Sequence, residues 1–181
     1  MRTVFAAAVA LTALSALMNN NPGAALLLVA AAAWLAVRAR SAARMVGSRK
    51  LAIRTEPGHE VKVAARHEGG HVALAKAAGG KVLGAEVYPD GSGVTWVRMP
   101  ASATVVDEIA VCVAGEVAAR TSRGCSSDQA DVRAALATLP AGERDAARRA
   151  GYDRARSVVG GFLFDGGVSA TAEKLLRDGR L

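Results

Sequence analysis

The chain has 181 residues, 51% of them hydrophobic, and a net charge of +7, which allows one domain of moderate size plus a further segment. The basic balance comes without an aromatic-studded basic surface or a Cys/His finger spacing, and this argues against nucleic acid as a partner. The two cysteines, Cys112 and Cys125, are too few for a disulfide framework and indicate a reducing compartment.

Two uncharged apolar runs open the chain, at residues 3–18 and 23–37, with the turn-forming sequence NNNP between them. Each run is shorter than the roughly 20 residues that usually span a bilayer. A soluble helical pair would normally keep a charged face, and a cleaved signal peptide would need a clear cleavage site. The pattern favours a transmembrane helical hairpin over residues 1–40, with those two interpretations as alternatives.

The positive charges around these runs predict an orientation. The NNNP turn has no positive charge, whereas Arg2 precedes the first run and an arginine cluster follows the second. The positive-inside rule then predicts a double-pass protein of the cell membrane, with both termini in the cytoplasm. Residues 41–56 are expected to form a basic linker facing anionic headgroups of the lipid bilayer, and residues 57–181 a cytoplasmic domain.

The stretch VAARHEGGHVALAKAAGG, residues 63–80, carries two of the three histidines. A helix is expected over residues 60–78, where His67 and His71 would lie on one face and aim at a common point. Glu68 follows His67 directly, which completes the H-E-x-x-H pattern. In this pattern two histidines bind zinc and the glutamate acts on the zinc-bound water.

A catalytic zinc takes three protein ligands and leaves one position to water. His59 would be out of reach of the pair on a continuous helix, and the metzincin pattern would need a histidine where Ala77 stands. The third ligand is therefore expected to be a carboxylate or a cysteine from further along the chain.

A small β element is expected after this helix. A family resemblance, given below with the motifs that carry it, implies a strand at residues 84–88, a Pro/Gly turn and a strand at residues 94–97. Val94, Thr95 and Trp96 are expected either to offer an exposed edge, to which an extended substrate adds as a further strand, or to be an ordinary hairpin partner.

The remaining pattern is helical. Thr104 and Asp107 predict a capping box, and a further helix is expected from Asp128 to just before Pro140. A basic amphipathic helix is predicted over residues 141–159, ended by Gly160-Gly161, and a last helix over residues 170–177 with Ser169 as its cap. The predicted fold class is mainly α with a small β element, α+β.

The motif and its surroundings resemble a known family. AARHEGGHVALA followed by KVLGAEVYPDGSGVTWVRMP is similar to the protease domain of the FtsH-type membrane-anchored zinc metalloproteases, in which a helix with H-E-A-G-H leads into a strand, a turn and a short G-x-T strand. AVCVAGEVAARTSRGCSSDQADV resembles the family's later stretch GGRAAEE…TGASND, whose closing aspartate binds zinc. Ungapped, that aspartate falls on Asp128; Asp131 is the alternative, because the residues after it fit the family pattern better. The resemblance covers residues 57–181.

The resemblance implies a zinc metalloendopeptidase in which Glu68 is the catalytic base and His67, His71 and Asp128 bind one Zn²⁺ per chain. The family's AAA ATPase module has no counterpart, because no phosphate-binding G-x-x-x-x-G-K-[ST] sequence occurs and no ATP site is expected. Substrates are then expected to be peptides or unfolded or membrane proteins, and the family's rings suggest a homo-oligomer. The alternatives are a catalytically inactive, membrane-anchored binding module that keeps the peptidase fold, and a small membrane-perturbing protein.

Overall fold

The computed structural model describes residues 49–164 and 166–181. The chain divides into two units, Met1–Arg40 and Ser41–Leu181, and every described residue belongs to the second. This unit is mainly helical with one small antiparallel sheet, which agrees with the predicted α+β class. The predicted transmembrane hairpin lies outside the described residues. Among those that are described, no helix has both the length and the apolar character needed to cross a bilayer.

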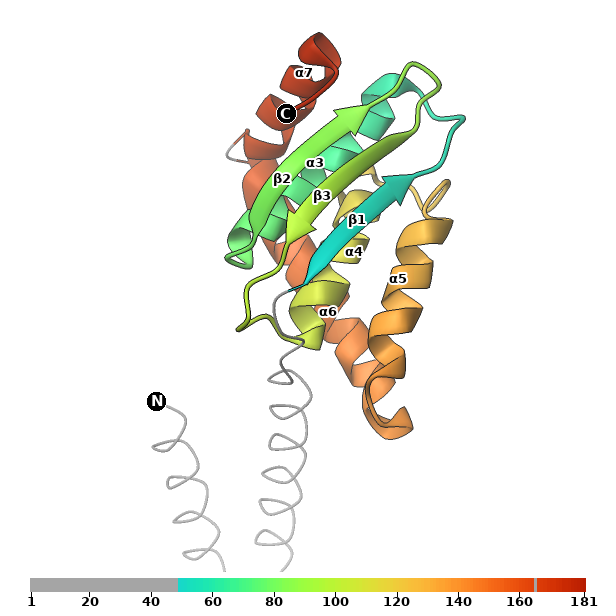
Figure 1. The fold of residues 1–181 in the computed structure, drawn as a ribbon, viewed down its shortest axis with the longest axis vertical. Coiled ribbons are helices and arrows are strands. Elements are labelled where there is room, and N and C mark those ends of the chain that lie inside the picture. Colours follow the sequence, from blue (N-terminus) through green and yellow to red (C-terminus); the bar gives the residue numbers. More distant parts are fainter. Residues whose placement is uncertain (1–48, 165) are drawn as a thin grey trace, which may run out of the picture. The chain divides into compact units, whose positions relative to one another are not determined.

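The sheet has three strands, β1 (Lys50–Thr55), β2 (Lys81–Val87) and β3 (Gly93–Arg98). The order is β1-β3-β2, and both pairings are antiparallel. β3 is therefore the central strand, bonded along both of its edges (Figure 1). Of the two interpretations of Val94, Thr95 and Trp96, the free edge is wrong, since β1 already occupies the second edge of their strand. The alternative, an ordinary hairpin partner, is confirmed by the antiparallel pairing of β3 with β2.

β1 lies within residues 41–56, which the sequence analysis expected to be a linker, so that prediction is wrong for Lys50–Thr55. Its side chains alternate strictly: Leu51, Ile53 and Thr55 are buried, and the other three, Lys50, Ala52 and Arg54, face solvent. This period of two is the mark of a strand with one buried face. The pattern was obscured because the exposed positions include the cations Lys50 and Arg54.

The described helices are α3 (Val61–Ala77), α4 (Val105–Ala119), α5 (Ser126–Ala137), α6 (Ala141–Phe164) and α7 (Gly167–Asp178). In Figure 1, α3 and α4 lie behind the sheet, α5 runs beside β1, and α7 runs beside β2. The sheet therefore has helices on one face. α4 contacts α3, α5 and α6, and α5 also contacts β1 directly.

The predicted capping box of α4 is confirmed. Thr104 Oγ1 accepts a hydrogen bond from the Asp107 backbone N–H at 3.1 Å, and Asp107 Oδ2 accepts one from the Thr104 N–H at 2.9 Å. These bonds satisfy two of the backbone donors that a helix N-terminus leaves without partners.

Two helix limits differ from the prediction. α6 continues through Gly160-Gly161, because glycine lowers helix stability by only about 1 kcal/mol per residue and the buried Ala155 and Val159 keep this part of α6 packed. α7 begins at Gly167, so Ser169 lies inside the helix and Gly166 takes the cap position in a left-handed conformation at φ 78°.

α4 belongs to two apolar clusters. Its residues pack on one side against sheet and α3 side chains such as Ile53 and Leu74. On the other side they pack against α5 and α6 side chains such as Val132 and Leu136. α3 and α4 approach very closely, because a Cβ at Gly70 would stand only 2.4 Å from the carbonyl oxygen of Ala114. This contact holds the H-E-x-x-H helix against the centre of the domain.

Candidate metal centre

The three side chains of the H-E-x-x-H pattern are buried. His67 is 2% exposed, and Glu68 and His71 are fully enclosed. His71 Nδ1 lies 2.7 Å from the carbonyl oxygen of Val111 on α4. A carbonyl oxygen can only accept, so Nδ1 carries the proton and donates it. In the neutral ring this leaves the Nε2 lone pair free, as in a metal-binding histidine oriented by an outer hydrogen bond.

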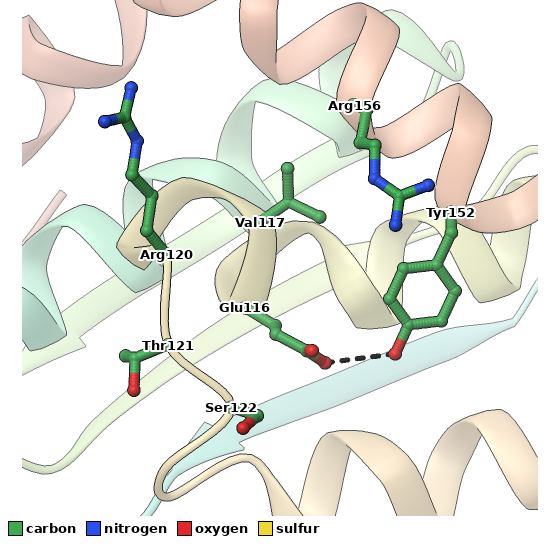
Figure 2. Close-up of a pocket in the computed structure, with 7 residues that line it drawn as sticks. All are labelled: Glu116, Val117, Arg120, Thr121, Ser122, Tyr152 and Arg156. Carbon is green, nitrogen blue, oxygen red and sulfur yellow. Dashed lines mark hydrogen bonds between the residues drawn. The ribbon is translucent and has the colours of Figure 1, made fainter.

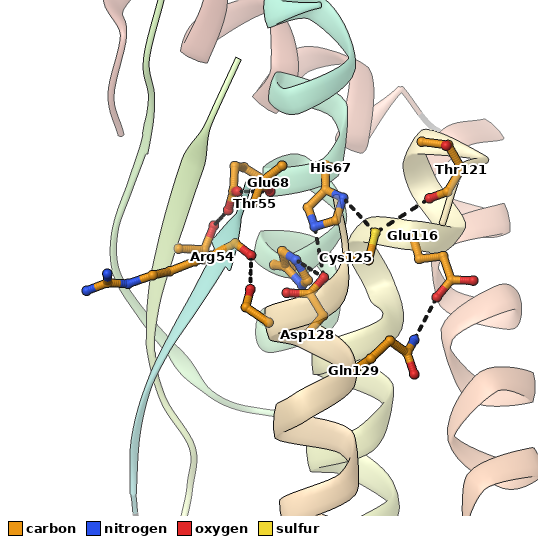
Figure 3. Close-up of polar contacts among 12 residues, drawn as sticks. Arg54, Thr55, His67, Glu68, Glu116, Thr121, Cys125, Asp128 and Gln129 are labelled. Carbon is orange, nitrogen blue, oxygen red and sulfur yellow. Dashed lines mark hydrogen bonds and ion pairs between the residues drawn. The ribbon is translucent and has the colours of Figure 1, made fainter. Parts of the chain in front are cut away.

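Asp128 joins this pair from the first turn of α5. Its Oδ2 atom lies 3.0 Å from His67 Nε2 and 3.5 Å from His71 Nε2, and its side chain is fully buried (Figure 3). Asp131, one turn further along α5, is half-buried. Within the described part of the chain, the ion pairs of both histidines go to Asp128 and none goes to Asp131.

Gly115 of α4 forms the wall opposite these nitrogens. A Cβ at this position would stand 2.2 Å from His67 Nε2 and 2.5 Å from His71 Nε2. Both ring nitrogens therefore aim at the same small space beside the Gly115 backbone. That space exists because the residue has no side chain.

His71 and Asp128 each shift the pKa of the other. Burial lowers the pKa of His71, but the Asp128 carboxylate and, more weakly, Glu68 raise it, and the pKa moves from 6.5 to about 9. Burial raises the pKa of Asp128, yet the neighbouring His71 and His67 lower it below its usual value. The centre therefore holds an anionic carboxylate against a ring that keeps its proton at neutral pH when no metal is bound.

The residues fit a divalent metal ion. Among the described residues, neither His71 Nε2 nor Asp128 Oδ1 has a hydrogen-bond partner, although both are buried. Buried polar atoms without partners are costly and rare. Two imidazole nitrogens and a carboxylate oxygen are also the donor set of a catalytic zinc site.

Cys125, the residue before α5, is also close to this centre. Its Sγ atom, a His67 nitrogen and an Asp128 carboxylate oxygen all lie within 4.8 Å of one another. The sulfur approaches Nδ1 of His67 at 3.9 Å, whereas Asp128 approaches Nε2. One imidazole cannot offer both nitrogens to one ion. Burial also raises the pKa of the Cys125 thiol to about 12, which disfavours the thiolate that metals bind. We therefore treat Cys125 as an outer neighbour of His67.

Glu68 faces the sheet. Its two carboxylate oxygens accept hydrogen bonds from Thr55 Oγ1 at 2.6 Å and from Thr95 Oγ1 at 2.5 Å. An exposed edge was one of two interpretations for Thr95, and its side chain is fully buried. Figure 3 shows Thr55 and Glu68 meeting on the sheet side of His67.

Two hollows flank the centre. One of about 420 Å³ lies at the carboxyl end of β1, with Thr55, Pro57, Tyr88, Gly93 and Trp96 among its lining residues. A second, of about 320 Å³, lies between α4 and α6 (Figure 2). There Tyr152 donates a hydrogen bond to Glu116 at 3.0 Å. The first hollow is the one next to Glu68, because its lining residue Thr55 also binds the Glu68 carboxylate.

A buried two-histidine motif on one helix, an aspartate from another helix and an α+β scaffold are features typical of a metallopeptidase-type domain. A family model described as "Peptidase M50B-like" matches residues 55–120, from the end of β1 to the end of α4. This match supports a membrane metallopeptidase-type domain and does not single out the FtsH type. Asp128 lies beyond the matched segment. Neither the comparison with curated proteins nor that with solved structures finds a match.

Three residues that border this centre, Thr55, Gly115 and Cys125, were not predicted as part of it. Thr55 has a local signal, since it continues the alternation of β1. Gly115 is a helix-interior glycine, which often marks a close approach. Cys125 was considered for disulfide chemistry and was not named as a neighbour of the histidines, and its contact with His67 joins residues 58 positions apart.

Proposed function

We propose that the chain is a membrane-anchored zinc metalloendopeptidase, FtsH-like in its peptidase residues but without an ATPase of its own. The observation that carries this proposal is the convergence of His67 Nε2, His71 Nε2 and the Asp128 carboxylate beside Gly115. These three side chains would hold one Zn²⁺. Zinc in such a site lowers the pKa of its bound water and polarises a carbonyl oxygen.

Glu68 is the proton carrier in this proposal. It takes a proton from the attacking water as the water oxygen bonds to the carbonyl carbon of the scissile peptide. It then delivers that proton to the amide nitrogen as the carbon–nitrogen bond breaks, which gives one carboxylate and one amine. His71 stays oriented throughout by its bond to the Val111 carbonyl.

The hollow of about 420 Å³ is where we place the substrate. Its lining includes the large faces of Tyr88 and Trp96 and the ring of Pro57, and these favour a bulky apolar side chain. With no unfoldase in the chain, the substrates we propose are peptides and unfolded or loosened membrane proteins. The apolar runs at residues 3–18 and 23–37 would anchor the enzyme in the cell membrane with the peptidase domain in the cytoplasm.

The test uses the full chain purified in detergent. We expect about one zinc per chain by elemental analysis, in line with a single site, and cleavage of a fluorogenic casein that a chelator abolishes. Glu68→Gln should retain zinc and lose about 100-fold or more in kcat, which is the usual contribution of a general acid–base group. His71→Ala should lose the zinc itself.

His59→Ala is the matched control, because His59 lies outside the centre, and it should keep both zinc and activity. Proteolysis that persists in Glu68→Gln would refute the role of that residue. Zinc bound at one per chain without cleavage of any substrate would favour the alternative, an inactive binding module.

A further inference from the structure

The carboxylate of Glu68 is held on the side of the sheet by two strands. Thr55 of β1 donates to Oε1 at 2.6 Å, and Thr95 of β3 donates to Oε2 at 2.5 Å. The carboxylate is fully buried, as is Thr95, and Thr55 is 4% exposed. Each carboxylate oxygen thus has one hydroxyl donor, and both donors are themselves buried.

The register of the sheet explains why two hydroxyls and an empty space meet here. Thr55 pairs directly with Gly93, and Thr95 lies two residues further along β3 on the same buried face. A Cβ at Gly93 would stand 2.6 Å from Glu68 Oε1 and 2.8 Å from its Cγ. Gly93 therefore leaves the room that the carboxylate fills, between the two threonines.

We infer that Thr55, Gly93 and Thr95 form a carboxylate notch that positions Glu68 for proton transfer. This inference rests on the proposed function. An ionised carboxylate offers about four lone-pair sites, and the notch uses two of them. The hydroxyls bind from the sheet side, so the other sites stay available to a water on the side of the histidines. Thr55 and Thr95 are positioning residues, because they act on the reaction only through Glu68.

The notch also joins the base to the hollow where we place the substrate. Thr55 and Gly93 line that hollow and also border the Glu68 side chain. A substrate in the hollow would therefore lie against the same two residues that hold the base.

The first arm of the test measures kinetics of the zinc-loaded full chain. Thr95→Val and Thr55→Val keep the side-chain shape and delete the hydroxyl. Each should lower kcat about tenfold while KM and zinc content stay unchanged, because neither threonine contacts an imidazole. Thr95→Ser and Thr55→Ser restore the donor and should restore kcat. Unchanged kcat in the valine variants, or failure of serine to rescue, would overturn the notch.

Gly93→Ala tests the empty space and should lower kcat more than either valine variant. Gly160→Ala is its matched control, because a Cβ at Gly160 meets nothing within 4 Å, and it should leave kcat unchanged. Equal kcat in the two alanine variants would mean that the carboxylate does not need the space at Gly93.

The second arm does not depend on catalysis. In metal-free protein, the denaturation midpoint is compared for Thr95→Val, Glu68→Ala and the double variant. The valine substitution should lower the midpoint when Glu68 is present and have little effect when it is absent. If the two substitutions lowered the denaturation midpoint additively, Thr95 would not act through Glu68, and the notch would be overturned whatever the proteolytic activity. Coupling without any proteolysis by the unmodified chain would instead overturn the proposed function and leave the notch as a structural carboxylate site.

Discussion

α3 and α5 supply side chains to the same buried point, but they do so in different ways. α3 contributes two histidines through a spacing within one helix, so their common direction follows from helix geometry alone. α5 contributes Asp128 through its packing between β1 and α4, 57 positions or more along the chain from either histidine. The family match ends at residue 120 and so includes α3 without α5. Local geometry thus defines half of the centre, and tertiary packing supplies the other half.

Removal of the Asp128 carboxylate should have the largest effect on zinc affinity. Asp128→Asn should weaken zinc binding about 100-fold or more, because even the outer partners of metal ligands contribute 10–100-fold. Asp131→Asn is the matched control one turn away, and it should change the affinity less than about threefold. Competition with a chromophoric chelator measures both. Equal losses in the two variants would show that α5 contributes a general negative charge and no specific ligand.

Gly115→Ala tests whether the histidines of α3 and Asp128 of α5 need the space beside the Gly115 backbone in order to bind zinc. Its Cβ would stand 2.2 Å from His67 Nε2, so we expect displaced rings, at least a tenfold weaker zinc affinity and an unfolding free energy lower by about 1–3 kcal/mol. Gly142→Ala is the control, because its Cβ meets nothing within 4 Å, and neither property should fall. Chelator competition and urea denaturation report the two quantities. An unchanged zinc affinity in Gly115→Ala would show that the two imidazole rings can bind zinc without the space at Gly115.

The pH dependence tests the coupling between α3 and α5. In the metal-free protein the pKa of His71 rises from 6.5 to about 9, so the stabilisation from its pair with Asp128 is fully present below pH 6.5 and is lost as the pH rises through about 9. The lowered pKa of Asp128 means that the same stabilisation is lost as the pH falls through the acidic range. Urea midpoints of metal-free protein between about pH 2 and pH 10 would show this decline on both sides.

Zinc affinity should have the opposite slope in the neutral range. Zinc must displace the His71 proton, so the apparent affinity should rise about tenfold per pH unit up to about pH 9. In Asp128→Asn the rise should level off at a lower pH, because the carboxylate that raises the His71 pKa is gone. A zinc affinity independent of pH between 6 and 8 would contradict the protonated state of His71.

The sequence was sufficient for features that depend on neighbouring residues. Helix spacing predicted the shared direction of His67 and His71, and the family resemblance implied the strand, turn and strand that correspond to β2 and β3. The capping box at Thr104 follows from the chemistry of two residues three apart. The histidine pair and the capping box each depend on residues only three or four positions apart in the sequence.

Features that depend on distant partners were not predictable in the same way. Whether β3 has a free edge depends on β1, which precedes α3 in the sequence, whereas β3 follows it. The alternation of buried and exposed residues in β1 was not recognised, because β1 lies in a basic stretch of the sequence. The choice between Asp128 and Asp131 depends on how α5 packs, since both acids lie within one turn of the same helix. The Gly160-Gly161 pair gives a local signal for a helix end, yet α6 continues because its buried residues keep it packed.

Thr104→Ala should have the smallest effect and separates the fold from the centre. Loss of this N-cap should lower the unfolding free energy by about 1 kcal/mol. Zinc affinity should stay unchanged, because the cap lies at the start of α4 and Gly115 lies three turns further along. Ser169→Ala is the control: Ser169 was expected to cap the last helix but lies inside α7, where alanine costs nothing. If Thr104→Ala also lowered zinc affinity, the stability of the N-terminal end of α4 would affect the metal centre. The geometry of His67 and His71 would then depend on the packing of α4 as well as on the spacing within α3.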